Sequence, residues 1–554
     1  MKIKTLVTNH KLLIFVLLLA AILRFWQLGN VPPHLSPDEA ALGYNAFSIL
    51  NTGHDEHHQL FPIIFKSFGD FKPGLYVYLT IPAILLFNLT EFAVRFPSAL
   101  SGVIAVYLVY KITKRLEFKT SGLEIVASLM LAISPWHIQF SRGAWEANVA
   151  ITLTLAGIFY FFKSLQKQKY LILSTVFFAL TLITYQGAKL STAIVVLLLV
   201  VLYWRDIIKF KLKNITYSLI AGGIISIPVV LSFFSGQTGR LGVFSVFSYP
   251  RSDDYLQHFL DETGVNKNSL IYYLFYNEPL NFLRGIMGRY FNHFSGRFLF
   301  FEGDWQNPMF SAPYHGMLTL ADIPLFVSGV AVAFKNLFKK NNVFIFGWLL
   351  LSPLPAVLSR DQVQAVRALN MAVPLSILLA FGTIWIWNKL NFKILKLALI
   401  ALYLVSYIYY LDAYFVHFPK SRSNDWGYGY KQIVQAIQPY YNDYDRIKIQ
   451  QSFAQPYIYF LFFDKVSPIE FWLTSDYVDG PAGDVGFVKK FDKYIFSDLH
   501  YDVDFNTPGL VAARSSDVPP ERISDQNKYS VIERIYNPAG EEEFVVFSVN
   551  NVKE

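Results

Sequence analysis

The chain has 554 residues, of which 53% are apolar and 17% aromatic, and its mean hydropathy is +0.35. A soluble protein does not sustain this composition over such a length, and nearly uncharged segments of about 20 residues recur, so we predict a multi-span membrane protein. The net charge of +8 does not indicate nucleic-acid binding, because the basic residues form short clusters between apolar segments. The absence of cysteine excludes disulfides, thiolate metal sites and cysteine nucleophiles.

Eleven membrane spans are predicted. The first follows Lys2, Lys4 and Lys11 and resembles a signal peptide, but its apolar run continues to Phe25 without a small-residue cleavage site, so we expect it to remain uncleaved. The apolar segment 75–87 is short, and we expect it to lie in the interface or to re-enter the membrane. The spans are placed near residues 11–29, 92–111, 122–140, 147–163, 170–185, 188–204, 215–234, 317–334, 342–358, 367–387 and 395–416.

Basic residues cluster in alternate connections between these spans. All such connections, together with the N-terminal lysines, fall on one side, which the positive-inside rule identifies as the cytoplasm. The acidic outer loops 30–91 and 235–316, and everything after about residue 417, then face outward at the plasma membrane. The basic connections lie near residues 111–119, 163–169, 205–213, 335–340 and 389–396.

The chain divides into a membrane domain, 1–416, and a polar C-terminal region, 417–554. Residues 531–536, a turn at Asn537–Gly540, and residues 544–548 form a pattern typical of a strand, a turn and a second strand. Residues 446–450 predict another strand. We therefore expect a small extracytoplasmic α/β domain after an all-α polytopic bundle.

Two adjacent acids, Asp38 and Glu39, follow the first span. Ionisable groups at a membrane edge are costly to desolvate and are therefore functional candidates. A carboxylate close to an acceptor hydroxyl can act as general base. The same stretch also fits the N-terminus of a helix, with Ser36 as cap, Pro37 in the first turn and acids after it.

Further charges follow in the same outer loop. Asp70 could orient Lys72, and Lys72 could hold a phosphate, and a surface ion pair in a Gly/Pro-rich turn fits the two residues equally well. Arg95, at the start of the second span, could bind a lipid phosphate in a bidentate way or extend to the interface without further function.

Other outer turns add charges on the same side. Arg142 and Glu146 are spaced i, i+4, so they can meet on one helix face near Asp38. Arg367 lies in a later outer turn that also carries Arg360 and Asp361. The long outer loop contributes Arg284, Arg289, His293 and Arg297.

The run Gly53–His58 groups three imidazoles with two acids. His57 and His58 are adjacent, so their side chains diverge on a regular element, and catalytic metal sites usually draw ligands from separate segments. We therefore predict no cofactor, with a divalent metal ion as the alternative.

The order of the motifs in the first outer loop resembles that of the multi-span GT-C glycosyltransferases. The acid pair is followed by Gly-Asp-Phe-Lys-Pro-Gly-Leu-Tyr at 69–76 and by Ala-Val-Arg-Phe-Pro-Ser-Ala-Leu at 93–100. The most similar branch is the dolichyl-phosphate-mannose protein mannosyltransferase family, with the lipid A aminoarabinose transferases as bacterial relatives. The resemblance covers residues 20–200 and, more loosely, 280–415.

This resemblance implies transfer of a sugar from a polyprenyl-phosphate donor to a protein, lipid or glycan acceptor outside the membrane. Asp38 would be the base, with Glu39 as its acidic neighbour, and Lys72 and Arg95 would match the lysine near the lipid phosphate and the essential arginine. Glu146 falls approximately where a second acid is found.

In that reaction the acceptor oxygen attacks C1 from the face opposite the phosphate, which predicts inversion. Lys72, Arg95 or Arg367 could stabilise the charge of the leaving phosphate. Gly74, in place of a usual proline, and the absence of a large inserted β-trefoil domain favour a prokaryotic enzyme.

Two other functions remain open. A lipid-linked sugar transporter or flippase would carry charges midway along its helices, whereas the charges here gather at the outer ends. A polysaccharide polymerase or ligase also uses outer loops and lipid-linked sugars.

Overall fold

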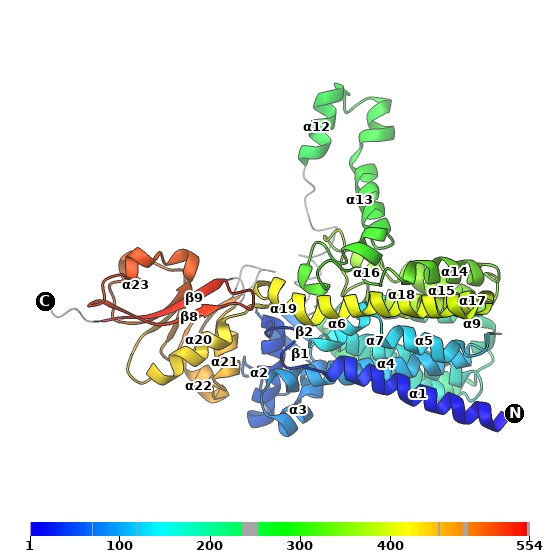
Figure 1. The fold of residues 1–554 in the computed structure, drawn as a ribbon, viewed down its shortest axis with the longest axis horizontal. Helices are drawn as coiled ribbons and strands as arrows, with labels where there is room; N and C mark the ends of the chain where they lie inside the picture. Colours follow the sequence, from blue (N-terminus) through cyan, green and yellow to red (C-terminus); the bar gives the residue numbers. More distant parts are fainter. Residues whose placement is uncertain are drawn as a thin grey trace.

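The computed structural model describes residues 2–68, 70–118, 120–234, 253–452, 455–479 and 486–550. Gly69, Lys119 and the start of the second outer loop lie outside this part. Figure 1 shows a helical bundle and a smaller sheet domain placed end to end, with the two chain termini at opposite ends of the molecule.

Helices form in all eleven segments predicted as spans. By length and composition, six described helical segments can each cross a membrane (α4, α7, α9, α10, η4 with α17, and α18 with the turns after it), and the pair α5–α6, bent by 54°, could form a seventh. The chain is therefore a multi-pass membrane protein; eleven crossings remain a prediction. The bundle helices are α1 (Lys2–Phe25), α4 (Glu91–Arg115), α5 (Leu123–Ala132), α6 (Pro135–Arg142), α7 (Glu146–Ser164), α8 (Tyr170–Leu182), α9 (Ala188–Ile207), α10 (Leu212–Phe234), α14 (Asp322–Phe334), α15 (Lys340–Leu351), α17 (Ala372–Lys389) and α18 (Lys393–Asp412).

Two glycines allow α14 and α17 to pack backbone against backbone. A Cβ atom at Gly329 would lie 1.9 Å from the carbonyl oxygen of Leu378, and one at Gly382 would lie 1.8 Å from that of Leu325. Small residues at such positions are how membrane helices approach closely without a hydrophobic driving force between them.

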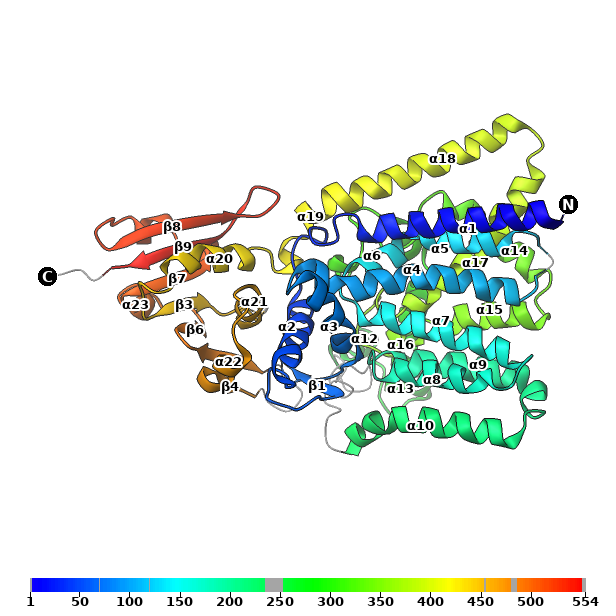
Figure 2. The ribbon, with the colours of Figure 1, turned by 90° about the horizontal axis from the view of Figure 1, so that it is seen from below.

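The predicted basic turns share one end of the bundle. Arg115 donates to Gln166, which joins the first two basic connections. Lys340 lies 3.4 Å from Asp206, which joins two of the others. The N-terminus lies at this end, and the first outer loop and the sheet domain lie at the other (Figure 2). The bundle thus separates its basic turns from its acidic loops as the charge pattern predicts.

The first outer loop folds into α2 (Pro37–Thr52), the hairpin β1–β2 (Ile64–Ser67 and Asp70–Pro73) and α3 (Leu75–Phe87). Ser36 caps α2: its side chain accepts from the Glu39 N–H, and the Glu39 carboxylate accepts from the Ser36 N–H. Both helices lie at the end of the bundle opposite the basic turns and run across the direction of the long helices (Figure 2).

The second outer loop projects from the side of the bundle as α12 and α13 (Figure 1). Short helical turns then return the chain to the outer end of the bundle. The elements of this side are α12 (Asp253–Thr263), η1 (Tyr272–Tyr276), α13 (Glu278–Asn292), η2 (Arg297–Phe301), η3 (Pro308–Phe310), α16 (Leu354–Val357) and η4 (Leu369–Met371).

The C-terminal domain is built on a seven-stranded sheet of order β4-β5-β6-β3-β7-β9-β8. Strand β3 is parallel to β6 and β7, and the other pairs are antiparallel. The predicted strands correspond to β3 (Ile447–Gln450), β8 (Tyr529–Tyr536) and β9 (Glu542–Val549), which confirms the α/β expectation. The remaining elements are η5 (Ala413–His417), α19 (Phe418–Ser421), η6 (Asn424–Trp426), α20 (Tyr430–Ile437), η7 (Gln438–Tyr440), α21 (Tyr457–Phe463), α22 (Pro468–Thr474), β4 (Asp476–Val478), β5 (Phe487–Phe491), β6 (Tyr494–Ser497), α23 (Tyr501–Asp504), β7 (Gly509–Arg514), η8 (Ser515–Asp517) and η9 (Pro520–Ile523).

Candidate active site

The two adjacent acids of α2 lie in different environments. Successive side chains on a helix diverge by about 100°. The Asp38 side chain is 54% exposed and forms an ion pair with Lys72, whereas Glu39 points into the protein and is 3% exposed. Of these two acids, only Asp38 is therefore accessible to a substrate.

Asp38 and Lys72 line a small cavity together with Glu146. Lys72 reaches it from β2, where the antiparallel register places it opposite Phe65, and Glu146 reaches it from the first turn of α7. Three residues predicted from separate parts of the sequence thus meet at one cavity. The arrangement combines a solvent-accessible carboxylate, an ammonium group and a second carboxylate.

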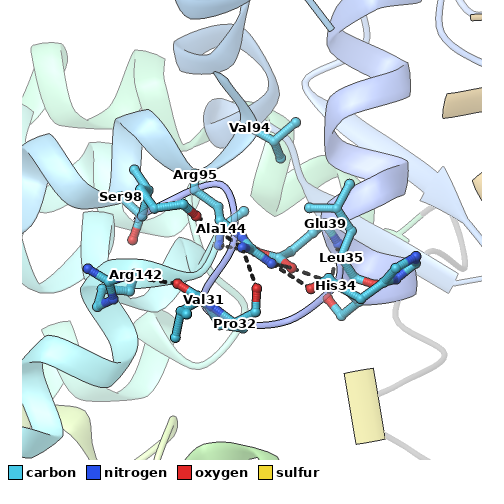
Figure 3. A network of polar contacts seen from close by, with 12 residues as sticks. Val31, Pro32, His34, Leu35, Glu39, Val94, Arg95, Ser98, Arg142 and Ala144 are labelled. Carbon is cyan, nitrogen blue, oxygen red and sulfur yellow. Dashed lines mark hydrogen bonds and ion pairs between the residues drawn. The ribbon is translucent and has the colours of Figure 1, made fainter. Parts of the chain in front are cut away.

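Glu39 forms a buried ion pair with Arg95 (Figure 3). Arg95 Nε lies 3.0 Å from Oε1 and Nη2 lies 3.1 Å from Oε2, while the N–H groups of Ala144 and Ser36 donate to the same carboxylate at 2.7 and 3.0 Å. These donors occupy both oxygens, and the side chain is almost fully buried. These contacts favour a structural role for Glu39 over the predicted catalytic one.

Arg95 uses all of its donors within the protein. Besides Glu39, its guanidinium donates to the carbonyl oxygens of Leu28, Pro32 and His34 at 3.1, 3.0 and 2.5 Å. An arginine has five N–H groups, and these contacts account for them. These contacts favour a structural role for Arg95, in which it holds residues 28–34 against α4, over the predicted role of binding a lipid phosphate.

Arg142 is likewise directed at backbone carbonyls. It donates to Leu23 and Arg24 at 2.9 and 3.2 Å, and to Val31 at 3.0 Å. Helix α6 ends at Arg142, residues 143–145 are largely extended, and α7 begins at Glu146. The predicted i, i+4 pair on one helix face is therefore wrong. Arg142 contacts the carbonyl oxygens after the first span, and Glu146 lines the Asp38 cavity.

The remaining predicted charges lie outside the residues that line the Asp38 cavity. Asp70 is within electrostatic reach of Lys189 at the start of α9. Arg367 Nη1 lies 3.5 Å from Asp361 Oδ2, so this cation is neutralised within its own turn.

Two residues near the cavity were not among the predicted candidates. Asn45 lies seven positions after Asp38 on the same face of α2, and this helical spacing was the available signal. Its amide oxygen accepts from the Glu56 N–H at 2.9 Å, and its Nδ2 donates to Glu56 Oε1 at 3.2 Å. Burial raises the pKa of Glu56 to about 8.

The histidines of the run 53–58 pack against the C-terminal domain. The His58 ring lies 4.5 Å from that of Trp472, and the His57 ring lies 5.0 Å from that of Tyr477. Among the residues that the structure describes, no group of three His, Cys, Asp or Glu side chains lies close enough together to hold a metal ion.

Comparison with known families and structures places this site in context. Residues 72–233 match the model of the family described as dolichyl-phosphate-mannose-protein mannosyltransferase. The matched region begins at Lys72 and contains Arg95, Arg142 and Glu146, and Asp38 precedes it. No curated protein matches the sequence.

Solved structures resemble the chain over nearly its whole length. The crystal structure of ArnT from Cupriavidus metallidurans bound to undecaprenyl phosphate has 11% identity and a TM-score of 0.53, covering 96% of this chain and 97% of that one. The Archaeoglobus fulgidus oligosaccharyltransferase in the apo form has 12% identity and a TM-score of 0.48, covering 98% and 74%. The likeness to ArnT shows a shared fold.

Proposed function

We propose that the chain is a membrane glycosyltransferase of the GT-C class, of the protein mannosyltransferase and ArnT type, with Asp38 and Lys72 as its reaction centre. The family match over residues 72–233 and the fold shared with ArnT support this proposal. The proposed donor is a sugar linked to polyprenyl phosphate, and the proposed acceptor is a hydroxyl group of a protein, lipid or glycan. ArnT, which has the same fold, was crystallised with undecaprenyl phosphate, and this supports the class of donor.

The observation that carries the proposal is the ion pair between the half-exposed Asp38 and Lys72, on the cavity that Glu146 also lines. Lys72 binds the donor phosphate as a point charge. Asp38 takes the acceptor proton as the acceptor oxygen forms its bond to C1 and the bond from C1 to the phosphate oxygen breaks. The polyprenyl phosphate leaves with the electron pair, and the configuration at C1 inverts.

The proposed location is the outer face of a prokaryotic plasma membrane, with the N-terminus in the cytoplasm. The basic turns at the N-terminal end of the bundle support this orientation. Nucleotide sugars are cytoplasmic, so a site at the outer end requires a lipid-carried donor.

The test is transfer by purified protein in vesicles from a polyprenyl-phosphate sugar, with the products identified by mass spectrometry and the anomeric configuration by NMR. Asp38→Asn should reduce turnover at least about 100-fold, because the general base is lost. Asp206→Asn, which removes an exposed ion pair with Lys340 at the opposite end of the bundle, is the matched control and should retain activity.

Retained activity in Asp38→Asn would overturn the base assignment. Lipid movement across the vesicle without sugar transfer would favour the transporter, and use of oligosaccharide donors alone would favour a polymerase or ligase. Product with retained configuration would overturn direct displacement.

A further inference from the structure

The C-terminal domain contacts the turn that carries Asp38. The Tyr459 hydroxyl, on α21, donates to the carbonyl oxygen of Leu35 at 3.1 Å. Leu35 immediately precedes the Ser36 cap of α2, and Asp38 lies in the first turn that this cap begins. Both Tyr459 and Leu35 are fully buried, so the bond is shielded from water.

A second bond reaches the same turn from α20. The Lys431 backbone N–H lies 3.2 Å from His34 Nε2, while His34 Nδ1 lies 2.8 Å from the Leu35 carbonyl oxygen. The carbonyl can only accept, so Nδ1 carries the proton and Nε2 accepts from Lys431. Burial lowers the pKa of His34 to about 4, which keeps this ring neutral.

Side-chain packing joins α21 to α2 as well. The Tyr459 ring lies 5.0 Å from that of His34 and stacks on Tyr430 at 4.9 Å. At Gly43, in the middle of α2, a Cβ atom would lie 2.6 Å from both Phe462 of α21 and Val94 of α4. Helix α2 is therefore held between the bundle and the C-terminal domain.

The residues just before Asp38 are held by both the bundle and the C-terminal domain. Arg95 of the bundle holds the carbonyl oxygen of His34, and Tyr459 of the C-terminal domain holds that of the next residue. Between them they hold the two residues before the Ser36 cap, and so they set the direction in which the first turn of α2 points. A displacement of about 1 Å at a catalytic group can cost about 100-fold in rate.

We propose that the C-terminal domain positions Asp38 for catalysis through the Tyr459 hydroxyl, and that Tyr459 is a positioning residue acting through Leu35. The inference rests on the proposed function of Asp38. A domain that only recruited the acceptor would change the acceptor KM, whereas a domain that positions Asp38 changes kcat.

Tyr459→Phe removes the hydroxyl and keeps the ring. We expect kcat to fall about tenfold, with the KM values for donor and acceptor within about twofold of the wild type. Tyr529→Phe is a matched control: its buried hydroxyl donates to the Phe505 carbonyl at 3.0 Å, in a part of the same domain remote from α2 in the fold. It should lose similar stability and keep its kcat.

Hydrogen exchange gives a readout independent of activity. The amides of residues 34–42 should exchange faster in Tyr459→Phe than in the wild type or in Tyr529→Phe. His34→Phe, which cannot accept from Lys431, should reproduce both effects and provides a second variant if Tyr459→Phe is not obtained folded.

An unchanged kcat in Tyr459→Phe, a raised acceptor KM alone, or an equal loss in Tyr529→Phe would overturn the proposal. If the wild type transfers no sugar in this assay, the proposed function fails. The exchange comparison then still tests whether Tyr459 holds the first turn of α2.

Discussion

Replacing Glu39 by glutamine tests the buried pair with Arg95. The Glu39 carboxylate accepts two N–H groups of Arg95 and the backbone N–H groups of Ser36 and Ala144, at 2.7 to 3.1 Å. Glutamine offers one acceptor oxygen, and its NH2 group would face donors. The Arg95 charge would also lose its carboxylate while remaining fully buried.

We expect Glu39→Gln to destabilise the folded protein strongly. Removing one partner of a buried ion pair costs about 3–5 kcal/mol, because an uncompensated charge is left in a low-dielectric interior. We expect Glu39→Gln to lower the free energy of unfolding by about this amount, and kcat to fall because α2 is no longer held.

The assay is denaturant unfolding of the purified protein in a fixed detergent. Glu302→Gln is the matched control, because Glu302 pairs with Arg297 at 2.6 Å with both side chains about half exposed. Exposed pairs contribute about 0–1 kcal/mol, so this variant should unfold almost as the wild type does. Equal unfolding free energies for Glu39→Gln and Glu302→Gln would refute the buried-pair reasoning.

Three further variants probe other parts of the structure. Lys72→Met should raise the donor KM about tenfold by removing a charged phosphate ligand, whereas Lys66→Met, on the same hairpin but paired with Asp479, should leave it unchanged in the same assay. Glu56 keeps its proton up to about pH 8 in the folded state, whereas the unfolded chain loses it near pH 4.5. The free energy of unfolding should therefore fall as pH rises between these values. Glu56→Gln should flatten this part of the pH profile of unfolding. Gly382→Ala should disrupt packing of α14 on α17 and lower Tm, whereas Gly223→Ala, whose Cβ would meet nothing within 4 Å, should not.

Local signals in the sequence were sufficient for several elements. The Ser36 cap, Pro37 and first-turn acids predicted the start of α2, because a helix N-terminus is decided by bonds between residues three apart. The turn at Asn537–Gly540 predicted the β8–β9 hairpin for the same reason. Both features depend on neighbours in the chain and not on tertiary contacts.

The roles of the arginines could not be predicted in this way. Arg95 binds carbonyl oxygens more than 60 positions away, and every residue has a carbonyl, so no side-chain pattern marks these partners. Arg142 offered one local signal, since Gly143 directly after it disfavours continuation of the helix. That signal argued against pairing Arg142 with Glu146 on one face.

The Asp38–Lys72 ion pair has a consequence for the order of events in the proposed reaction. Asp38 is half exposed, so water and salt screen its carboxylate within the pair. The donor phosphate is a diester with one negative charge, like the carboxylate, so it can compete with Asp38 for Lys72, and its attraction to Lys72 increases as the bond to C1 breaks and its charge grows. Donor binding would then release the carboxylate oxygens of Asp38 to accept the acceptor hydroxyl, while the buried Glu39–Arg95 pair keeps the turn in place. Of the two neighbouring acids, the exposed Asp38 can meet a substrate, while the buried Glu39 stabilises the turn that carries it.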